Sequence, residues 1–495
     1  MSAGNVSFVS YQFARTNGVL IVDVTAEAAQ VVVRASSGAL ALAELRREFG
    51  VPLKVATVSD TEFDQRLAQT YERTEIVGAL ELDVAQDAEL ARLAQELPRT
   101  LDLLDASDDA PIVRLINALL VRALRERASD VHFEPSESRS STRFRVDGML
   151  RDVLTIDRTL HAALISRLKI MASLDIAEKR LPQDGRISVR LAGRPVDVRV
   201  STLPTGHGER AVLRLLDKQS GRLDLGRLGM SETMLAQIES LVRAPQGIVL
   251  VTGPTGSGKT TTLYAALDRV DTSRCNVMTV EDPIEYDLAA ISQTQVNARI
   301  GMSFARALRS ILRQDPDVIM IGEIRDQETA QVAIQASLTG HLVLATLHTN
   351  DACASVTRLL DMGVEPYLLA SSLLGVAAQR LVRLACPECA ERVPVPPGEL
   401  ERQGVATALA DQVETLVRVR GCASCNGSGY RGRSGIYEVL TMNEALRSLI
   451  HARAAEAQIR TAARSAGMAT LREDGMRWVA SGATTFEEVL RATSE

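Results

Sequence analysis

The chain has 495 residues, of which 46% are hydrophobic and only 3% aromatic, so we expect two to four domains with cores of Leu, Val, Ile and Ala. A formal net charge of −6 argues against a basic nucleic-acid-binding protein, and six cysteines in so long a chain do not form a disulfide framework. No apolar run reaches the ~18 residues that cross a bilayer and the N-terminus lacks a signal pattern, so we expect a cytoplasmic protein.

Residues 1–96 combine short apolar runs with an expected helix at 39–49, a pattern that predicts a small α/β domain. They contain no motif with recognisable chemistry, so we expect this domain to dock a partner. Residues 97–110 contain four aspartates and predict an acidic linker.

A second small α/β domain is predicted at 111–216. It begins with a helix and continues with strand-like runs, including hairpins around the Asp-Gly pair at 147–148 and over 186–201. The polar, glycine-bearing segment 217–229 predicts a linker, and the remaining residues, 230–495, form a third domain.

A phosphate-binding loop opens this third domain. Residues 253–260 fit G-x-x-x-x-G-K-[ST], with an apolar strand at 247–251 before them and a helical pattern after them. Backbone N–H groups of such a loop surround phosphates, Lys259 reaches the β- and γ-phosphates of ATP, and Thr260 binds Mg²⁺. The residues predicted to hold the nucleotide are Gly253, Pro254, Thr255, Gly256, Ser257, Gly258, Lys259, Thr260 and Thr261.

Polar residues follow the later predicted strands, where an α/β sheet places its ligands. Glu285 lies just beyond the strand 276–280, and Glu323 follows the strand 317–321 in a Gly-Glu pair that resembles a Walker B motif. Either glutamate is a candidate to orient the attacking water. His348 follows the next strand and is a candidate sensor of the γ-phosphate.

Two C-x-x-C pairs predict a metal site. Cys386 with Cys389 and Cys422 with Cys425 are separated by 32 residues. Four thiolates form a tetrahedral Zn²⁺ site. We therefore expect a zinc-binding module inserted at 384–434.

The order of these motifs resembles the secretion ATPases of type II secretion and type IV pili. The segments "ASDVHFEP" (128–135), "LPQDGRI" (181–187) and "GHLVLATLHTND" (340–351) are similar to that family, and the resemblance covers residues 111–495. It implies a homohexameric ring in which a PAS-like middle domain is joined by a mobile linker to a RecA-like ATPase domain.

The resemblance also implies four arginines that close over the phosphates. Arg199 and Arg214 match the family's arginines in the middle domain, and Arg309 and Arg313 match those of the ATPase domain. The last two lie four residues apart, so we expect both on one helix face.

Within the family, the tetracysteine module and the short N-terminal region favour the type II secretion ATPase, which powers pseudopilus assembly, over the type IV pilus assembly ATPase. The resemblance implies the membrane-anchored assembly protein L and the platform protein F as partners, and peripheral association with the inner membrane through them.

A GTPase is excluded, because none of the five lysines lies in an [NT]-K-x-D element. A RecA-like DNA-translocating motor is the more distant alternative, but the acidic chain predicts no nucleic-acid partner.

Overall fold

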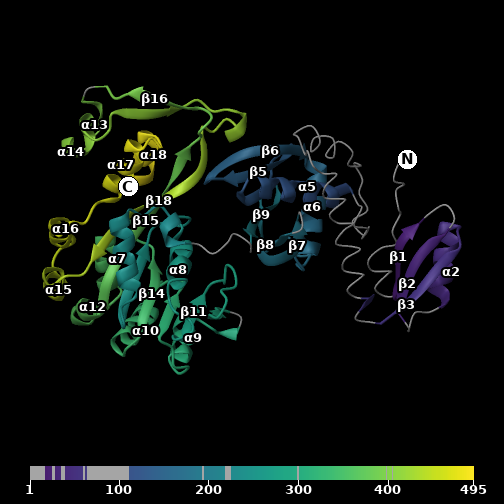
Figure 1. The fold of residues 1–495 in the computed structure, drawn as a ribbon, viewed down its shortest axis with the longest axis horizontal. Coiled ribbons are helices and arrows are strands. Elements are labelled where there is room, and N and C mark those ends of the chain that lie inside the picture. The colour runs from purple at the N-terminus through teal and green to yellow at the C-terminus, as the bar shows by residue number, and fades with distance from the viewer. Residues whose placement is uncertain are drawn as a thin grey trace. The chain divides into compact units, whose positions relative to one another are not determined.

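The structure, a computed structural model, describes residues 17–24, 28–34, 39–59, 62–63, 111–191, 194–217, 224–297, 300–396, 398–403 and 405–494. Its internal contacts divide the chain into two compact units, one of residues 1–146 and 150–217 and the other of residues 147–149 and 218–495 (Figure 1). The predicted acidic linker at 97–110 lies outside the described residues, as do residues 218–223 of the second predicted linker.

The described part of the N-terminal region is a three-stranded sheet with one helix. Strand β1 (Val19–Val24) pairs antiparallel with β2 (Ala29–Arg34), and β2 pairs parallel with β3 (Leu53–Val58). A parallel pair needs a crossover, which α2 (Ala39–Phe49) provides. One side of the sheet and the helix bury Val19, Ile21, Val31, Val33, Ala41 and Leu45 together.

The middle region, residues 111–217, is a six-stranded sheet packed with two helices. The helices are α5 (Pro111–Arg125) and α6 (Arg158–Met171), and the strand order is β6-β5-β4-β9-β8-β7. The turn at 147–148 has positive φ at both residues, as a tight Asp-Gly hairpin requires. The strands are β4 (Ala128–Pro135), β5 (Arg139–Val146), β6 (Met149–Asp157), β7 (Gln183–Leu191), β8 (Arg194–Thr205) and β9 (Gly208–Asp217).

The second unit is built on a seven-stranded sheet of order β12-β11-β13-β14-β10-β15-β18. Its strands run parallel except β18, which pairs antiparallel with β15. Parallel neighbours place their carboxyl ends at one edge of the sheet, and this edge holds the candidate site. The strands are β10 (Gly247–Thr252), β11 (Val277–Glu281), β12 (Ser292–Gln295), β13 (Val318–Ile321), β14 (Leu342–Leu347), β15 (Leu373–Ala385) and β18 (Tyr430–Thr441).

Helices cover both faces of this sheet, so its central strands are apolar throughout. On β10, Ile248 and Leu250 join a core with α9, α10, α11, α12 and α15, whereas Val249 and Val251 join a core with α7 and α8. The helices are α7 (Glu232–Val242), α8 (Lys259–Leu267), α9 (Phe304–Ile311), α10 (Gln327–Leu338), α11 (Ala352–Asp361), α12 (Pro366–Ser372) and α15 (Glu444–His451).

The residues between β15 and β18 form a separate small element with its own antiparallel pair. Strand β16 (Ala390–Pro394) pairs with β17 (Thr415–Val419), and the short helices α13 (Glu399–Arg402) and α14 (Thr407–Ala410) lie between them in sequence. The chain ends in α16 (Glu456–Ser465), α17 (Leu471–Ala480) and α18 (Phe486–Thr493). Helices α17 and α18 share a core with Val382 of β15 and Ile436 of β18.

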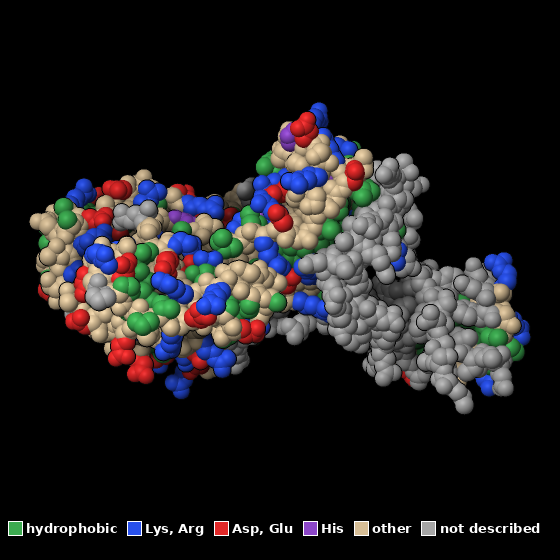
Figure 2. Space-filling model, turned by 90° about the horizontal axis from the view of Figure 1, so that it is seen from above, with side chains coloured by type: hydrophobic (Ala, Val, Ile, Leu, Met, Phe, Trp, Pro, Cys, Tyr) green, Lys and Arg blue, Asp and Glu red, His purple; other side chains and the backbone are tan. Residues whose placement is uncertain are grey.

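The predicted fold class, a multidomain α/β protein with a small N-terminal sheet-and-helix region and a larger unit built on a mainly parallel sheet, is confirmed. Among the described helices, none is both long and apolar enough to cross a membrane. On the face of the second unit seen in Figure 2, acidic and basic side chains are interspersed.

Candidate nucleotide and metal sites

The phosphate-binding loop joins β10 to α8, and its glycines are sterically required. Gly253 has φ +150° and Gly258 has φ +89°. A Cβ on Gly253 would lie 2.4 Å from the carbonyl oxygen of Gln379, and a Cβ on Gly258 would lie 2.9 Å from the Gln379 side-chain nitrogen. The backbone can therefore curl this closely against β15 only without side chains at these positions.

Lys259, the first residue of α8, lies across this loop. Its side chain is buried, and Nζ donates to the carbonyl oxygens of Gly253 at 2.8 Å and Pro254 at 3.1 Å. Burial lowers the pKa of the Lys259 ammonium, an effect that the nearby Glu323 carboxylate opposes. The Lys259 ammonium therefore lies within electrostatic reach of the Glu323 carboxylate.

Glu323 and His348 meet at the carboxyl edge of the sheet. They follow β13 and β14, which are neighbours, and the His348 Nε2 lies 3.2 Å from a Glu323 carboxylate oxygen. Arg325 forms a further ion pair with Glu323. The structure therefore brings together Lys259, Glu323 and His348 from three separate segments.

The other predicted acidic segment begins at the end of β11, and its two glutamates, Glu281 and Glu285, lie in different environments. Glu281 is buried and accepts hydrogen bonds from Tyr264, from Thr279 at 2.6 Å and from Gln293 at 3.0 Å. A carboxylate with three donors is satisfied within the core and stabilises α8 against β11. Glu285 lies in the following loop, where its backbone N–H meets the Tyr264 hydroxyl at 3.4 Å.

The expectation that Arg309 and Arg313 lie on one helix face is wrong. Helix α9 ends at Ile311, so Arg313 lies beyond it and donates to the carbonyl oxygen of Arg309 at 2.8 Å. Pro316 disfavours helical backbone at Asp315, the residue before it, which has φ +52°. Arg309 pairs with Glu328 of α10 at 2.7 Å.

Arg199 and Arg214 lie directly opposite each other in the middle region, on β8 and β9. Opposed like charges repel, and Asp130 of β4 offsets this by accepting from the Arg214 Nε at 2.9 Å. The role of these two arginines at the phosphates stays a prediction.

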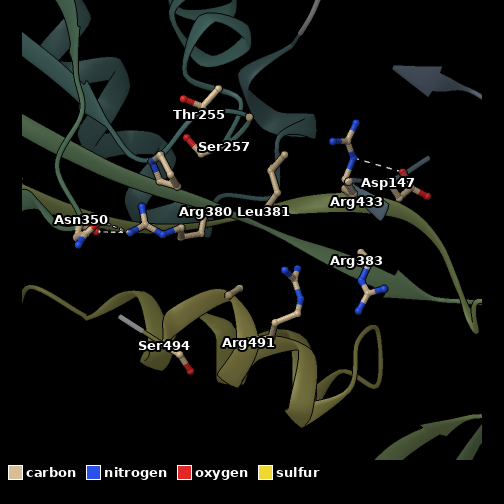
Figure 3. Close-up of a pocket in the computed structure, with 14 residues that line it drawn as sticks. Asp147, Thr255, Ser257, Asn350, Arg380, Leu381, Arg383, Arg433, Arg491 and Ser494 are labelled. Carbon is tan, nitrogen blue, oxygen red and sulfur yellow. Dashed lines mark hydrogen bonds and ion pairs between the residues drawn. The ribbon is translucent and has the colours of Figure 1, made fainter. Parts of the chain in front are cut away.

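A pocket beside the loop contains arginines that the sequence analysis missed (Figure 3). Arg380 of β15 points along the strand toward Asn350 and donates to its carbonyl oxygen at 2.9 Å. Among the described residues, no carboxylate lies within ion-pair distance of Arg380. Burial lowers the pKa of its guanidinium, and its charge in turn lowers the pKa of Lys259. Lys259 and Arg380 are therefore two neighbouring cations, and a phosphate is an anion that could pair with both of them.

The other arginines of the pocket have a structural partner. Arg383 and Arg491 both bind the buried carboxylate of Glu488, each at 2.6 Å, and Arg383 also stacks on the ring of Tyr430. No motif marks these residues. The available signal was that Gln379, Arg380 and Arg383 interrupt an otherwise apolar run of the sequence.

The four predicted cysteine ligands converge. Their sulfur atoms all lie within 4.8 Å of one another, with Cys386 to Cys422 at 3.8 Å and Cys389 to Cys425 at 3.9 Å. A tetrahedral zinc ion with Zn–S bonds of about 2.3 Å separates its sulfurs by roughly 3.8 Å. The donor set and its spacing therefore fit a structural zinc ion.

Backbone hydrogen bonds to sulfur support thiolate chemistry at this cluster. The backbone N–H groups of Cys422 and Gly429 donate to the Cys425 sulfur at 3.1 and 3.2 Å. Burial raises the pKa of this thiol, but these donors and the neighbouring Cys422 and Cys389 thiols outweigh it and bring the pKa to about 6, while the pKa values of Cys389 and Cys422 are raised. Such N–H···S bonds are typical of metal-binding cysteines.

Comparison with known proteins places the chain in a family. The profile of the family described as "Type II/IV secretion system protein" matches residues 105–491, and the profile of a domain of "GSPII protein E" matches residues 9–71. Type II secretion system protein HxcR of Pseudomonas aeruginosa is 59% identical over 459 residues, 92% of each chain. Type II secretion system protein E of Dickeya dadantii is 53% identical over 489 residues, 98% of this chain and 97% of that protein.

Two further comparisons concern a protein named as an ATPase and a protein named as a motor. Type II secretion system ATPase E of Vibrio cholerae is 53% identical over 459 residues, 92% of this chain and 90% of that protein. The crystal structure of the pilus retraction motor PilT with bound ADP superimposes with a TM-score of 0.51 at 26% identity, covering 77% of this chain and 97% of that one.

Proposed function

The chain belongs to the type II/IV secretion system protein family, and we propose that it is the ATPase that powers protein export through a type II secretion system, with residues 253–261 as its MgATP site. The observation that carries this proposal is the meeting of Lys259, Glu323 and His348 beside the phosphate-binding loop. Cations, a carboxylate and a histidine at one edge of a sheet are the parts that phosphoryl transfer to water requires.

In this mechanism the loop and its lysine bind the triphosphate. The Lys259 ammonium now donates to the carbonyl oxygens of Gly253 and Pro254, and when ATP binds it donates to the β- and γ-phosphates instead. The exposed Thr260 hydroxyl would hold Mg²⁺, which would neutralise phosphate charge when bound. Arg380 adds a second positive charge on the β15 side.

A glutamate orients the attacking water, and two candidates stay open. Glu323 is supported by its contact with His348 and its effect on Lys259. Glu285 is supported by its place after β11 at the same edge of the sheet. Since a base is needed only in the transition state, Gln at the true position lowers kcat while ATP still binds.

The tetracysteine cluster holds a structural zinc ion. Cys386, Cys389, Cys422 and Cys425 fill all four positions of a tetrahedral site and leave none open for substrate. The ion therefore organises the module between β15 and β18 and takes no part in hydrolysis.

The working form is a homohexamer on the cytoplasmic side of the inner membrane, recruited by the assembly protein L and the platform protein F of the type II apparatus. Three relatives that are 53–59% identical carry type II secretion names, which supports secretion over type IV pilus assembly. A DNA motor needs a continuous basic track, whereas acidic and basic side chains are interspersed over the ATPase unit on the face in Figure 2.

Lys259→Ala tests the assignment of the site. We expect Mg-ATPase activity near background and loss of exoprotein release from a strain that carries the variant, with the protein folded and its oligomeric state unchanged. Lys179→Ala, which removes an exposed lysine of the middle region, is the matched control and retains activity. Substantial turnover by folded Lys259→Ala protein excludes the loop as the catalytic site.

A further inference from the structure

Gln379 is a buried polar side chain in the middle of strand β15, and no catalytic role has yet been given to it. Only 2% of its surface is exposed. The register that pairs Thr252 of β10 with Ala378 places Gln379 level with the first residue of the phosphate-binding loop. Its neighbours along the strand are apolar alanines and a leucine, apart from Arg380.

Both ends of the Gln379 amide are engaged by the loop and its helix. The side-chain nitrogen donates to the carbonyl oxygen of Ser257 at 2.8 Å. The side-chain oxygen accepts from the Thr262 hydroxyl of α8 at 2.7 Å. The first bond fixes which end of the amide faces the loop, because a carbonyl oxygen can only accept and therefore requires the NH₂ group on that side, whereas the Thr262 hydroxyl can donate or accept.

The bond to Ser257 sets the direction of the next N–H group. The peptide bond between Ser257 and Gly258 is trans, so its carbonyl oxygen and its N–H point in opposite directions. With the carbonyl held toward β15, the Gly258 N–H is directed away from the strand and into the loop. Gly258 is also the N-cap of α8, where the backbone N–H has no partner within the helix.

We infer that Gln379 is a positioning residue for nucleotide binding, which holds the Gly258 N–H toward the phosphates through the carbonyl oxygen of Ser257. The inference rests on the proposed nucleotide site at 253–261. A free peptide unit in a glycine-rich loop can rotate, and the ligand then has to select the productive orientation. Gln379 removes this cost before ATP arrives.

The glycines of the loop agree with this role. Gly253 lies against the backbone carbonyl oxygen of Gln379, and Gly258 lies against its side-chain nitrogen, both within distances that a Cβ cannot occupy. Two of the loop's fixed glycines thus make room for the same strand residue. The Gly258 contact is the one that involves the glutamine side chain, because any residue at 379 would present the backbone oxygen that faces Gly253.

The test replaces Gln379 by Met, which has similar length but cannot donate. Because the N–H contact is made in the ground state and the transition state alike, we expect the KM for MgATP and the Kd for MgADP to rise about tenfold, as for one lost hydrogen bond to a charged group, with kcat within about twofold. Thr262→Ser keeps the donor hydroxyl and retains both constants, whereas Thr262→Val raises them partly.

Thr484→Val is the matched control for a structural effect. The Thr484 hydroxyl is also buried and donates to a β15 carbonyl oxygen, that of Arg383 at 2.6 Å, outside the loop. We expect this variant to lower the Tm without changing KM or the Kd for MgADP. If Gln379→Met behaves like Thr484→Val, the glutamine only stabilises the fold and the inference is wrong.

Lys259→Ala, measured in the same full-length protein and oligomeric state, separates this inference from the proposed site. Normal MgADP binding and turnover in Lys259→Ala would reject the site itself. Loss of activity in Lys259→Ala together with unchanged constants in Gln379→Met would reject only the role of Gln379.

Discussion

Glu488 of α18 allows a prediction whose size follows from the structure. Its side chain is fully buried and accepts from Arg383 of β15, through both the backbone N–H and the guanidinium, and from Arg491. Burial raises the pKa of this carboxyl, but the two arginines outweigh burial and lower it from 4.5 to about 2. The carboxylate therefore ties the C-terminal helix to the strand that passes beneath the phosphate-binding loop.

The lowered pKa sets the expected stability change. A carboxyl whose pKa falls from 4.5 to about 2 on folding contributes about 3 kcal/mol at neutral pH. Glu488→Gln removes this contribution and leaves two buried guanidinium groups short of an acceptor. For a unit of this size, about 3 kcal/mol corresponds to a fall in Tm of roughly 6–12 °C.

The assay is thermal unfolding of wild type and Glu488→Gln between pH 7 and pH 3. Because the folded pKa is depressed, the contribution is complete above pH 4.5 and is lost as the pH falls toward 2. The difference in Tm should therefore be largest at pH 7 and less than half as large at pH 3. Glu399→Gln, which breaks the exposed pair with Arg402, is the control and should change the Tm little. A Glu488→Gln effect no larger than this control, or one independent of pH, refutes the reasoning.

Three further predictions concern the metal, the pocket and the N-terminal region. Purified protein should contain close to one zinc per chain by elemental analysis, and the double variant Cys386→Ser with Cys389→Ser should contain none; absence of zinc from freshly reduced wild type would contradict the site. Arg380→Ala should raise the KM for MgATP about tenfold, as for a lost charge-assisted bond, while Arg402→Ala should not; equal KM values would exclude Arg380 from the phosphates. A protein that starts at Pro111 should keep basal ATPase activity but no longer co-fractionate with membranes that contain the secretion apparatus; unchanged recruitment would place the docking surface on the remaining chain.

The parts of the site that the sequence predicted are those fixed by local pattern. The loop at 253–260 follows from glycine spacing between an apolar strand and a helix, and both C-x-x-C pairs bring two sulfurs together by their spacing alone. Glu323 and His348 were found because each follows an apolar run that could only be a buried strand. Their contact follows from β13 and β14 being neighbours in a parallel sheet.

The parts that were missed depend on contacts between distant segments. Gln379 is 122 residues from Ser257, and nothing near it in the sequence indicates that β15 passes beneath the loop. The four-residue spacing of Arg309 and Arg313 suggested one helix face, but the helix ends between them, at Ile311. Spacing predicts a shared face only where the helix continues, and none of the three residues between these arginines is a helix breaker that would mark its end.

Strand β15 links the features that these experiments address. Gln379 lies under the phosphate-binding loop, Arg383 binds Glu488 of the last helix, and Cys386 is the first metal ligand after the strand ends. Cys386 lies seven residue steps beyond Gln379, about 23 Å along an extended strand at the usual rise. Loss of zinc therefore frees the far end of a strand that hydrogen bonds to β10 and β18 hold at the loop. It follows that zinc removal should destabilise the module and the C-terminal helices before it weakens nucleotide binding, whereas Gln379→Met should do the reverse.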